Sequence, residues 1–197
     1  MRTSVKVLIG VGVMAVLGIF LTGFMSYNKL RTLEKASDVS WVEVEKSLQY
    51  RYDKVPELVR SVTDVIDDED GVLARVMSAH NAASVTQLSN DLNKRVLGEQ
   101  TLEVAVAQLV SLIEADTNLS SNEDVTALVN EMVVAEDTFE VDRERYNTSV
   151  QEFNKVVTSF PMNIWSKVFG FDELRYYGEA PEASTEIESS ESEIGSN

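Results

Sequence analysis

Few side chains in this chain could do covalent chemistry. The one histidine, His80, lies in a helical pattern with no nearby combination of serine and acid that suggests a catalytic triad. The absence of cysteine removes thiolate nucleophiles and sulfur-rich zinc sites. The glycines lie in the N-terminal apolar segment or singly between helical patterns, so they form no phosphate-binding loop. We therefore predict a protein that is not an enzyme and holds no cofactor, and we interpret His80 as packed or solvent-facing.

An acidic run from Asp67 to Asp70 is the best candidate for a metal site. Aligning Gly71 with the sixth position of a twelve-residue calcium loop places Ile66 first and Met77 last, where that loop needs carboxylates. The pattern does not match. We interpret the run as a hydrated turn between two helices and predict no metal.

Three charged residues interrupt apolar helical stripes and carry more information. Arg51 interrupts one stripe, and Glu136 and Arg143 follow Met132 and Phe139 by four residues on another. A charge that faces a core must be paired or it costs several kcal/mol. We predict that Glu136 pairs with Arg51 or Arg143 and fixes the register of the helices. The alternative is that these long side chains extend to the edge of the bundle.

The elements that must position these charges are long helices. A seven-residue spacing, as in a coiled coil, predicts a helix from Ser121 or Asn122 to just before Pro161, with its core positions at Val125, Met132, Phe139, Tyr146, Phe153 and Phe160. An earlier pattern predicts a second long helix, with its core positions at Trp41, Val44, Leu48, Val55, Leu58, Val62 and Val65. Pro56 lies inside it and predicts a kink or a helix restart.

Between these two helices the pattern predicts shorter ones. A third helix has its apolar positions at Val72, Val76, Ala79, Ala83, Leu88 and Leu92. We expect Gly98 to interrupt the chain before an apolar segment at residues 102–113, and residues 117–122 to form a connector. Long amphipathic helices joined by short loops predict an all-α fold, an antiparallel bundle over residues 26–177.

The N-terminus carries a membrane signal. Residues 7–25 hold no charge, and about 20 helical residues cross a bilayer. A cleaved signal peptide is the rival interpretation, because Arg2 and Lys6 precede the apolar segment. The segment is longer than the apolar part of a typical signal and lacks small residues at the expected cleavage site. We therefore predict a short segment at residues 1–6 and a single transmembrane helix at residues 7–25, in contact with lipid.

Charge restricts the partners of the chain. The net charge is −16, which disfavours nucleic acid as a partner. Residues 178–197 contain six acidic side chains and no basic one, and we predict a disordered acidic tail. Lysine and arginine flank both ends of the apolar segment, so charge leaves the orientation of the bundle open.

Two motifs resemble the LemA family. The first is Arg51-Tyr52-Asp53 followed by Pro56, and the second is Tyr146-Asn147 followed by Val150 and Phe153-Asn154, with Glu136 and Arg143 between the two motifs. The chain departs from the family pattern at His80, where an arginine is usual, in lacking a proline before Asn118, and in its acidic tail.

The resemblance implies a single-pass, all-helical membrane protein with a short N-terminus outside and the bundle in the cytoplasm. Relatives are associated with organising bacterial membrane compartments, and the family implies no reaction. It further implies that Tyr146, Phe153 and Phe160 are core residues, that Asn147 and Asn154 hydrogen-bond across helices, and that Pro56 bends its helix.

These observations together predict a membrane-anchored, non-catalytic scaffold or assembly factor. We expect it to bind an unidentified protein partner through helix faces. The small residues Gly12, Ala15 and Gly18 would allow two spans to approach closely, but they lack the four-residue spacing of dimerising spans. The sequence therefore leaves homo-oligomerisation open. The alternative function is an adaptor or regulatory subunit of a membrane enzyme such as a protease.

Overall fold

The computed structural model describes residues 2–65, 71–89 and 91–178, with the backbone alone described at residues 2–9, 11 and 15. All regular elements in these ranges are helices: α1 (Arg2–Val62), α2 (Val72–Gln87), α3 (Leu92–Ala115), α4 (Thr117–Ser120), α5 (Glu123–Thr158) and α6 (Met162–Phe169). The predicted all-α fold is confirmed. The acidic run at residues 67–70 and the tail beyond residue 178 lie outside the described residues.

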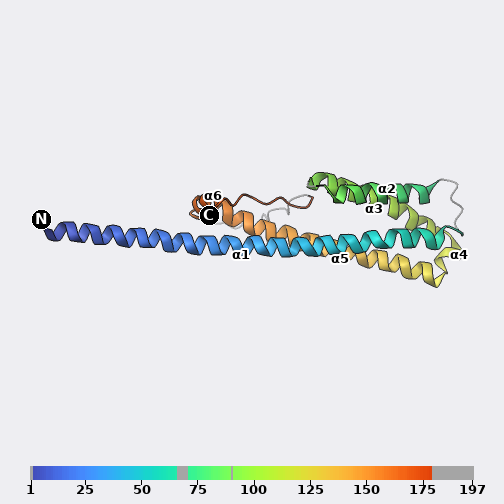
Figure 1. Cartoon of the computed structure of the whole chain (residues 1–197). Coiled ribbons are helices and arrows are strands. Elements are labelled where there is room, and N and C mark those ends of the chain that lie inside the picture. Colours follow the sequence, from blue (N-terminus) through green and yellow to red (C-terminus); the bar gives the residue numbers. More distant parts are fainter. Residues whose placement is uncertain (1, 66–70, 90, 179–197) are drawn as a thin grey trace, which may run out of the picture.

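Helix α1 joins the predicted transmembrane segment and the first bundle helix in one continuous element. Its 61 residues give a rod of about 90 Å, and Figure 1 shows it extending well beyond the other helices at its N-terminal end. Large apolar side chains between Val13 and Met25 are exposed, whereas Leu30, Val44 and Leu48 are completely buried. The same helix therefore offers an apolar surface at one end and a core stripe at the other.

Two described helices are long and apolar enough to cross a membrane, α1 and α3. In α3, 39% of the most apolar 18-residue stretch is buried, and Leu102 and Leu109 belong to the bundle core. In α1 only 18% of the corresponding stretch is buried. Helix α3 is thus a core helix, and of these two helices α1 carries the larger exposed apolar surface.

The bundle consists of two antiparallel helix pairs. Helix α5 runs back along the C-terminal part of α1, and α2 and α3 form a second pair beside them (Figure 1). The buried core takes side chains from all four long helices, among them Leu48, Leu58, Val76, Ala83, Leu102, Leu109 and Val150. The predicted antiparallel bundle is confirmed.

The core stripe of α1 also includes a charged residue. Val44 and Leu48 are completely buried, and Arg51 follows Leu48 by three residues, on the same face of the helix. Arg51 is itself only 3% exposed. The stripe therefore places a charged side chain directly after two buried apolar ones.

Helix α1 continues through Pro56, so the predicted helix restart is wrong. Proline has no amide hydrogen, which leaves the carbonyl of Tyr52 without its helical donor. His80 of α2 lies with its Nε2 atom 3.1 Å from that carbonyl oxygen. Because a carbonyl only accepts, Nε2 carries the hydrogen and donates it. His80 is thus a packed side chain that supplies the missing hydrogen bond of α1.

The predicted interruption at Gly98 is wrong, because this residue lies inside α3. A Cβ atom at this position would collide with the Thr86 side chain and come within 3.3 Å of the Ala83 backbone. The missing side chain therefore lets α2 and α3 approach closely. The predicted third helix also ends early, because α2 stops at Gln87, Leu88 is exposed and Leu92 opens α3.

Helix α5 begins as predicted, with the Asn122 side chain accepting hydrogen bonds from the amides of Asp124 and Val125. It ends at Thr158, before Pro161. Phe160 is 81% exposed, so its predicted core position is wrong. The predicted core position of Val65 is wrong for the same reason: both residues follow the last turn of their helix, where the helical period no longer directs them inward.

Candidate functional site

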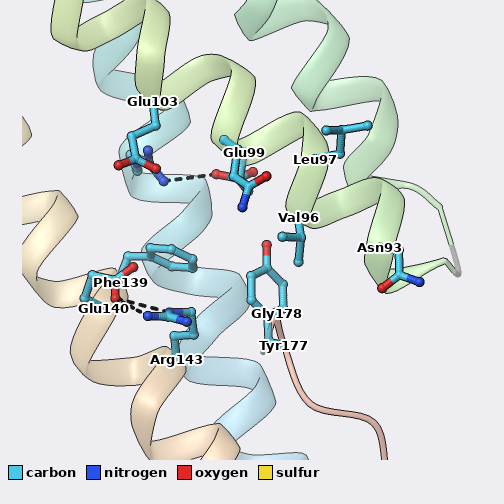
Figure 2. Close-up of a pocket in the computed structure, with 12 residues that line it drawn as sticks. Asn93, Val96, Leu97, Glu99, Glu103, Phe139, Glu140, Arg143, Tyr177 and Gly178 are labelled. Atoms are coloured by element: carbon cyan, nitrogen blue, oxygen red, sulfur yellow. Dashed lines mark hydrogen bonds and ion pairs between the residues drawn. The ribbon is translucent and has the colours of Figure 1, made fainter. Parts of the chain in front are cut away.

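A buried ion cluster joins three helices at the centre of the bundle. Arg51 of α1 is almost completely buried, and its Nε atom lies 2.7 Å from Oε2 of Glu136 on α5. Its Nη1 atom lies 3.0 Å from Oε2 of Glu99 on α3. The predicted pair of Glu136 with Arg51 is therefore present. Arg143 instead pairs with Glu140 on its own helix, as Figure 2 shows.

Neutral side chains extend this cluster to α2. The Gln87 side-chain amide donates to Oε1 of Glu99 at 3.0 Å and to the Tyr52 hydroxyl at 2.8 Å. The charged Arg95 donates from Nη2 to the side-chain oxygen Oε1 of Gln87 at 3.5 Å, and its guanidinium lies over the Trp41 ring. Hydrogen bonds and ion pairs therefore connect the four long helices around Glu99.

Sequence reasoning missed Glu99, although a signal was present. Glu99 follows Leu92 by seven residues and precedes Leu102 by three, so it stands on the apolar stripe of α3. This is the same signal that identified Arg51 and Glu136. The predicted interruption at Gly98 hides it, because a break there would separate Glu99 from Leu92.

Burial controls the charge of the cluster. Removal from water raises the pKa of Glu99 to about 7, an effect that Arg51 opposes and that the nearby carboxylates of Glu136 and Glu103 reinforce. Burial also raises the pKa of Glu136, again against the opposing charge of Arg51. Two carboxylates share one guanidinium, so the cluster can take up a proton near neutral pH.

A cleft of about 670 Å³ opens beside the cluster. Its walls include Arg51, Glu99, Glu103, Phe139, Arg143 and Tyr177. Figure 2 shows the Tyr177 side chain pointing into it from the C-terminal segment. The cleft brings together charges of both signs and an aromatic wall, so it offers a surface for hydrogen bonding.

The second polar site on α5 holds the segment at residues 170–178, which we call the C-terminal strap. The Asn147 side chain donates to the carbonyl of Tyr177 at 3.0 Å and accepts from its amide at 2.8 Å. Asn154 forms the same two bonds with Leu174, both at 2.8 Å. The predicted hydrogen bonds across helices are therefore wrong, because both asparagines bind the backbone of the strap.

Aromatic side chains complete the attachment of the strap. The Tyr146 hydroxyl donates to the carbonyl of Arg175 at 2.9 Å. The buried ring of Tyr177 lies 5.9 Å from both Trp41 and Phe139. Sequence reasoning missed the strap. Its sequence signal is the recurrence of apolar side chains at Phe171, Leu174 and Tyr177 beyond the last helix, of which the first and third are buried and Leu174 is partly buried.

The remaining candidates separate into core and surface. Phe153 is buried beside Leu30, in a second cluster at the end of the bundle nearest the apolar segment. Tyr52 and Pro56 lie at the contact with His80, as described above. Asp53 is exposed and accepts a hydrogen bond from Gln49 on its own helix. The structure therefore does not bring Asp53 into the ion cluster.

This arrangement defines a helical-bundle protein whose first helix continues into an exposed apolar segment. The sequence model of the LemA family matches residues 40–189. The chain belongs to the LemA family, which confirms the resemblance of the two motifs.

One relative is a magnetosome protein, MamQ of Magnetospirillum gryphiswaldense. It is 25% identical to this chain over 83 residues. The match covers 42% of this chain and 30% of that protein. The chain therefore spans less than a third of the length of the curated relative it matches.

Proposed function

We propose that this protein is a non-catalytic scaffold or assembly factor that is anchored in a membrane and acts by binding other proteins. The observation that carries the proposal is the continuity of α1. One helix contains the exposed apolar segment and the buried core stripe, so the bundle cannot turn independently of its anchor. A rigid link of this kind suits a protein that presents a binding face at a fixed place near a bilayer.

Residues 7–25 form the anchor in this proposal, and the protein crosses the membrane once. The bundle lies on the cytoplasmic side. Lys29, Arg31 and Lys35 follow the anchor on α1, and α6 adds Lys167 beside the same end of the bundle. The additional lysine supports this orientation, because basic residues next to a span are favoured on the cytoplasmic side.

Helix α5 offers a face for a partner. Val134 and Val141 are exposed and stand seven residues apart, so they lie on the same side of α5. Such spacing suits the packing of another helix. The family resemblance, which connects relatives with organising bacterial membrane compartments, supports the same role.

The absence of cysteine makes a site-specific test straightforward. Val134→Cys and Val141→Cys, each labelled with a photocrosslinker in intact membranes, are expected to capture the same protein. Ser120→Cys, at the far end of the bundle, is the matched control and should capture little of it. Equal capture at all three positions, or none, would contradict the proposed face.

The captured protein also distinguishes the two functions. A structural membrane protein or a second copy of this chain supports the scaffold. A stoichiometric enzyme that also co-purifies in mild detergent supports the adaptor instead.

A further inference from the structure

Helix α6 is arranged with its polar side inward. Its best-buried side chain is Ser166, which is 2% exposed and donates to the carbonyl of Val157 at 3.1 Å. Ile164 and Val168 are 54% and 65% exposed. They stand four residues apart and so project from the same face. A short helix that buries a serine and exposes its aliphatic side chains is poorly suited to water.

This helix lies against the end of the predicted anchor. A Cβ atom at Gly23 of α1 would meet the Trp165 ring at 2.9 Å, so the ring packs directly on the glycine. Phe169 stacks on Trp165 with ring centres 5.7 Å apart and meets Tyr27 edge-on at 5.2 Å. These contacts place α6 beside the last turns of the apolar segment.

An apolar cleft of about 650 Å³ lies between the two helices. Its lining joins Ile19, Phe20 and Phe24 of α1 to Trp165, Val168 and Phe169 of α6. The exposed apolar surface therefore continues from the anchor onto α6 without a polar boundary.

We propose that α6 lies in the membrane–water interface, with Ile164 and Val168 in contact with lipid acyl chains. This inference rests on the proposed anchoring by residues 7–25. A bilayer that surrounds those residues includes Gly23, and Trp165 packs on Gly23, so the lipid that covers the anchor also reaches α6. The bundle then contacts the membrane at two places.

The other side chains of α6 and its neighbours suit this position. Trp165 and Tyr27 are residue types enriched at membrane interfaces. Lys167 lies on the flank of the aliphatic face, where its long side chain can extend to the lipid head groups. Helices with one apolar and one polar side bind the interface in this way.

The two tryptophans of the chain allow a direct test. The full chain is reconstituted in phosphatidylcholine vesicles with or without bromine on the acyl chains, which quenches a tryptophan in contact with it. Trp41→Phe leaves Trp165 as the single tryptophan, and Trp165→Phe leaves Trp41, which lies in the bundle between Arg95 and Tyr146. Excitation at the red edge of the absorption band selects tryptophan over tyrosine. We expect brominated lipid to remove most of the Trp165 emission and to leave the Trp41 emission unchanged.

Exposed positions provide matched variants that should retain the fold. Ile164→Glu and Val168→Glu in the Trp41→Phe background should each reduce the quenching of Trp165. Val134→Glu, an equally exposed valine on α5, should leave it unchanged.

The outcomes separate this inference from the anchoring on which it depends. Protein that floats with the vesicles but shows unquenched Trp165 overturns the position of α6 and leaves the anchor intact. If crosslinking then finds dimers through α6, a second copy covers this face instead of lipid. Protein that does not float with the vesicles overturns both proposals.

Discussion

Helix α5 contributes side chains to two buried polar sites. The buried polar groups of the two sites are paired with partners of different kinds. The ion cluster balances Arg51 against Glu99 and Glu136, so its stability depends on charge. The strap site pairs the neutral amides of Asn147 and Asn154 with backbone groups. Neutral hydrogen bonds of this kind do not titrate. The comparison predicts that pH acts on the contacts among the helices at the cluster, whereas the asparagine hydrogen bonds that hold the strap do not depend on it.

Removing the shared cation should have the largest effect. Arg51→Met leaves the buried carboxylate of Glu99 and the partly buried one of Glu136 without their partner, and we expect a loss of about 3 kcal/mol in the free energy of unfolding at pH 8. Urea unfolding of the detergent-solubilised chain measures it. Lys46→Met, which removes an exposed lysine paired with the exposed Glu43, should change the value by less than about 0.5 kcal/mol. Similar losses in both variants would contradict a special role for the cluster.

The pH dependence of the cluster should come next in size. The pKa of Glu99 is higher in the folded chain, at about 7, than its ordinary value of 4.5, so the folded state binds more protons between these values. The free energy of unfolding should therefore fall as pH rises through this window, by on the order of 2 kcal/mol from Glu99. Glu99→Gln should remove that part of the slope in urea unfolding at a series of pH values. An unchanged slope would show that Glu99 does not titrate there.

Breaking one asparagine pair should have a smaller effect. Asn147→Ala removes both hydrogen bonds to the Tyr177 backbone without adding a charge, and we expect a loss of about 1.5 kcal/mol. Trypsin should then cut after Arg175 faster than in the unchanged chain. Asn130→Ala, at an exposed asparagine on the same helix, is the control. Cutting at the same rate in both variants would show that the strap is held by its rings alone.

The smallest effect is expected at the motif residue outside both sites. Asp53 is exposed, so Asp53→Ala should change the free energy of unfolding by less than about 0.5 kcal/mol. Urea unfolding checks this value. A larger loss would mean that Asp53 supports the cluster beside Arg51.

Features that depend on local periodicity could be predicted from the sequence. The start of α5 at Asn122 and the pair of Arg51 with Glu136 follow from a cap residue and from charges on an apolar stripe. The strap could not be predicted in this way, because the partners of Asn147 and Asn154 lie 30 and 20 residues further along the chain in an extended segment. Periodicity identifies which side of a helix is covered but does not identify what covers it.

Gly98 and Pro56 are less predictable. The sequence predicts an interruption at Gly98 and a kink or helix restart at Pro56, yet Gly98 lies inside α3 and Pro56 inside α1. In each case α2 compensates for the irregular residue. The Thr86 side chain occupies the space that a side chain at Gly98 would fill, and His80 donates to the Tyr52 carbonyl that Pro56 leaves without a donor. Such compensation depends on packing and cannot be read from one segment.

The contact between His80 and the Tyr52 carbonyl also determines where α2 can sit along α1. Sliding α2 along α1 by one turn, about 5.4 Å, would take the His80 imidazole out of reach of the Tyr52 carbonyl oxygen. That oxygen would then have neither a helical donor nor His80. Carbonyls along an unbroken helical ladder already have their donors and offer no such vacancy. Pro56 thereby fixes the position along α1 at which α2 docks.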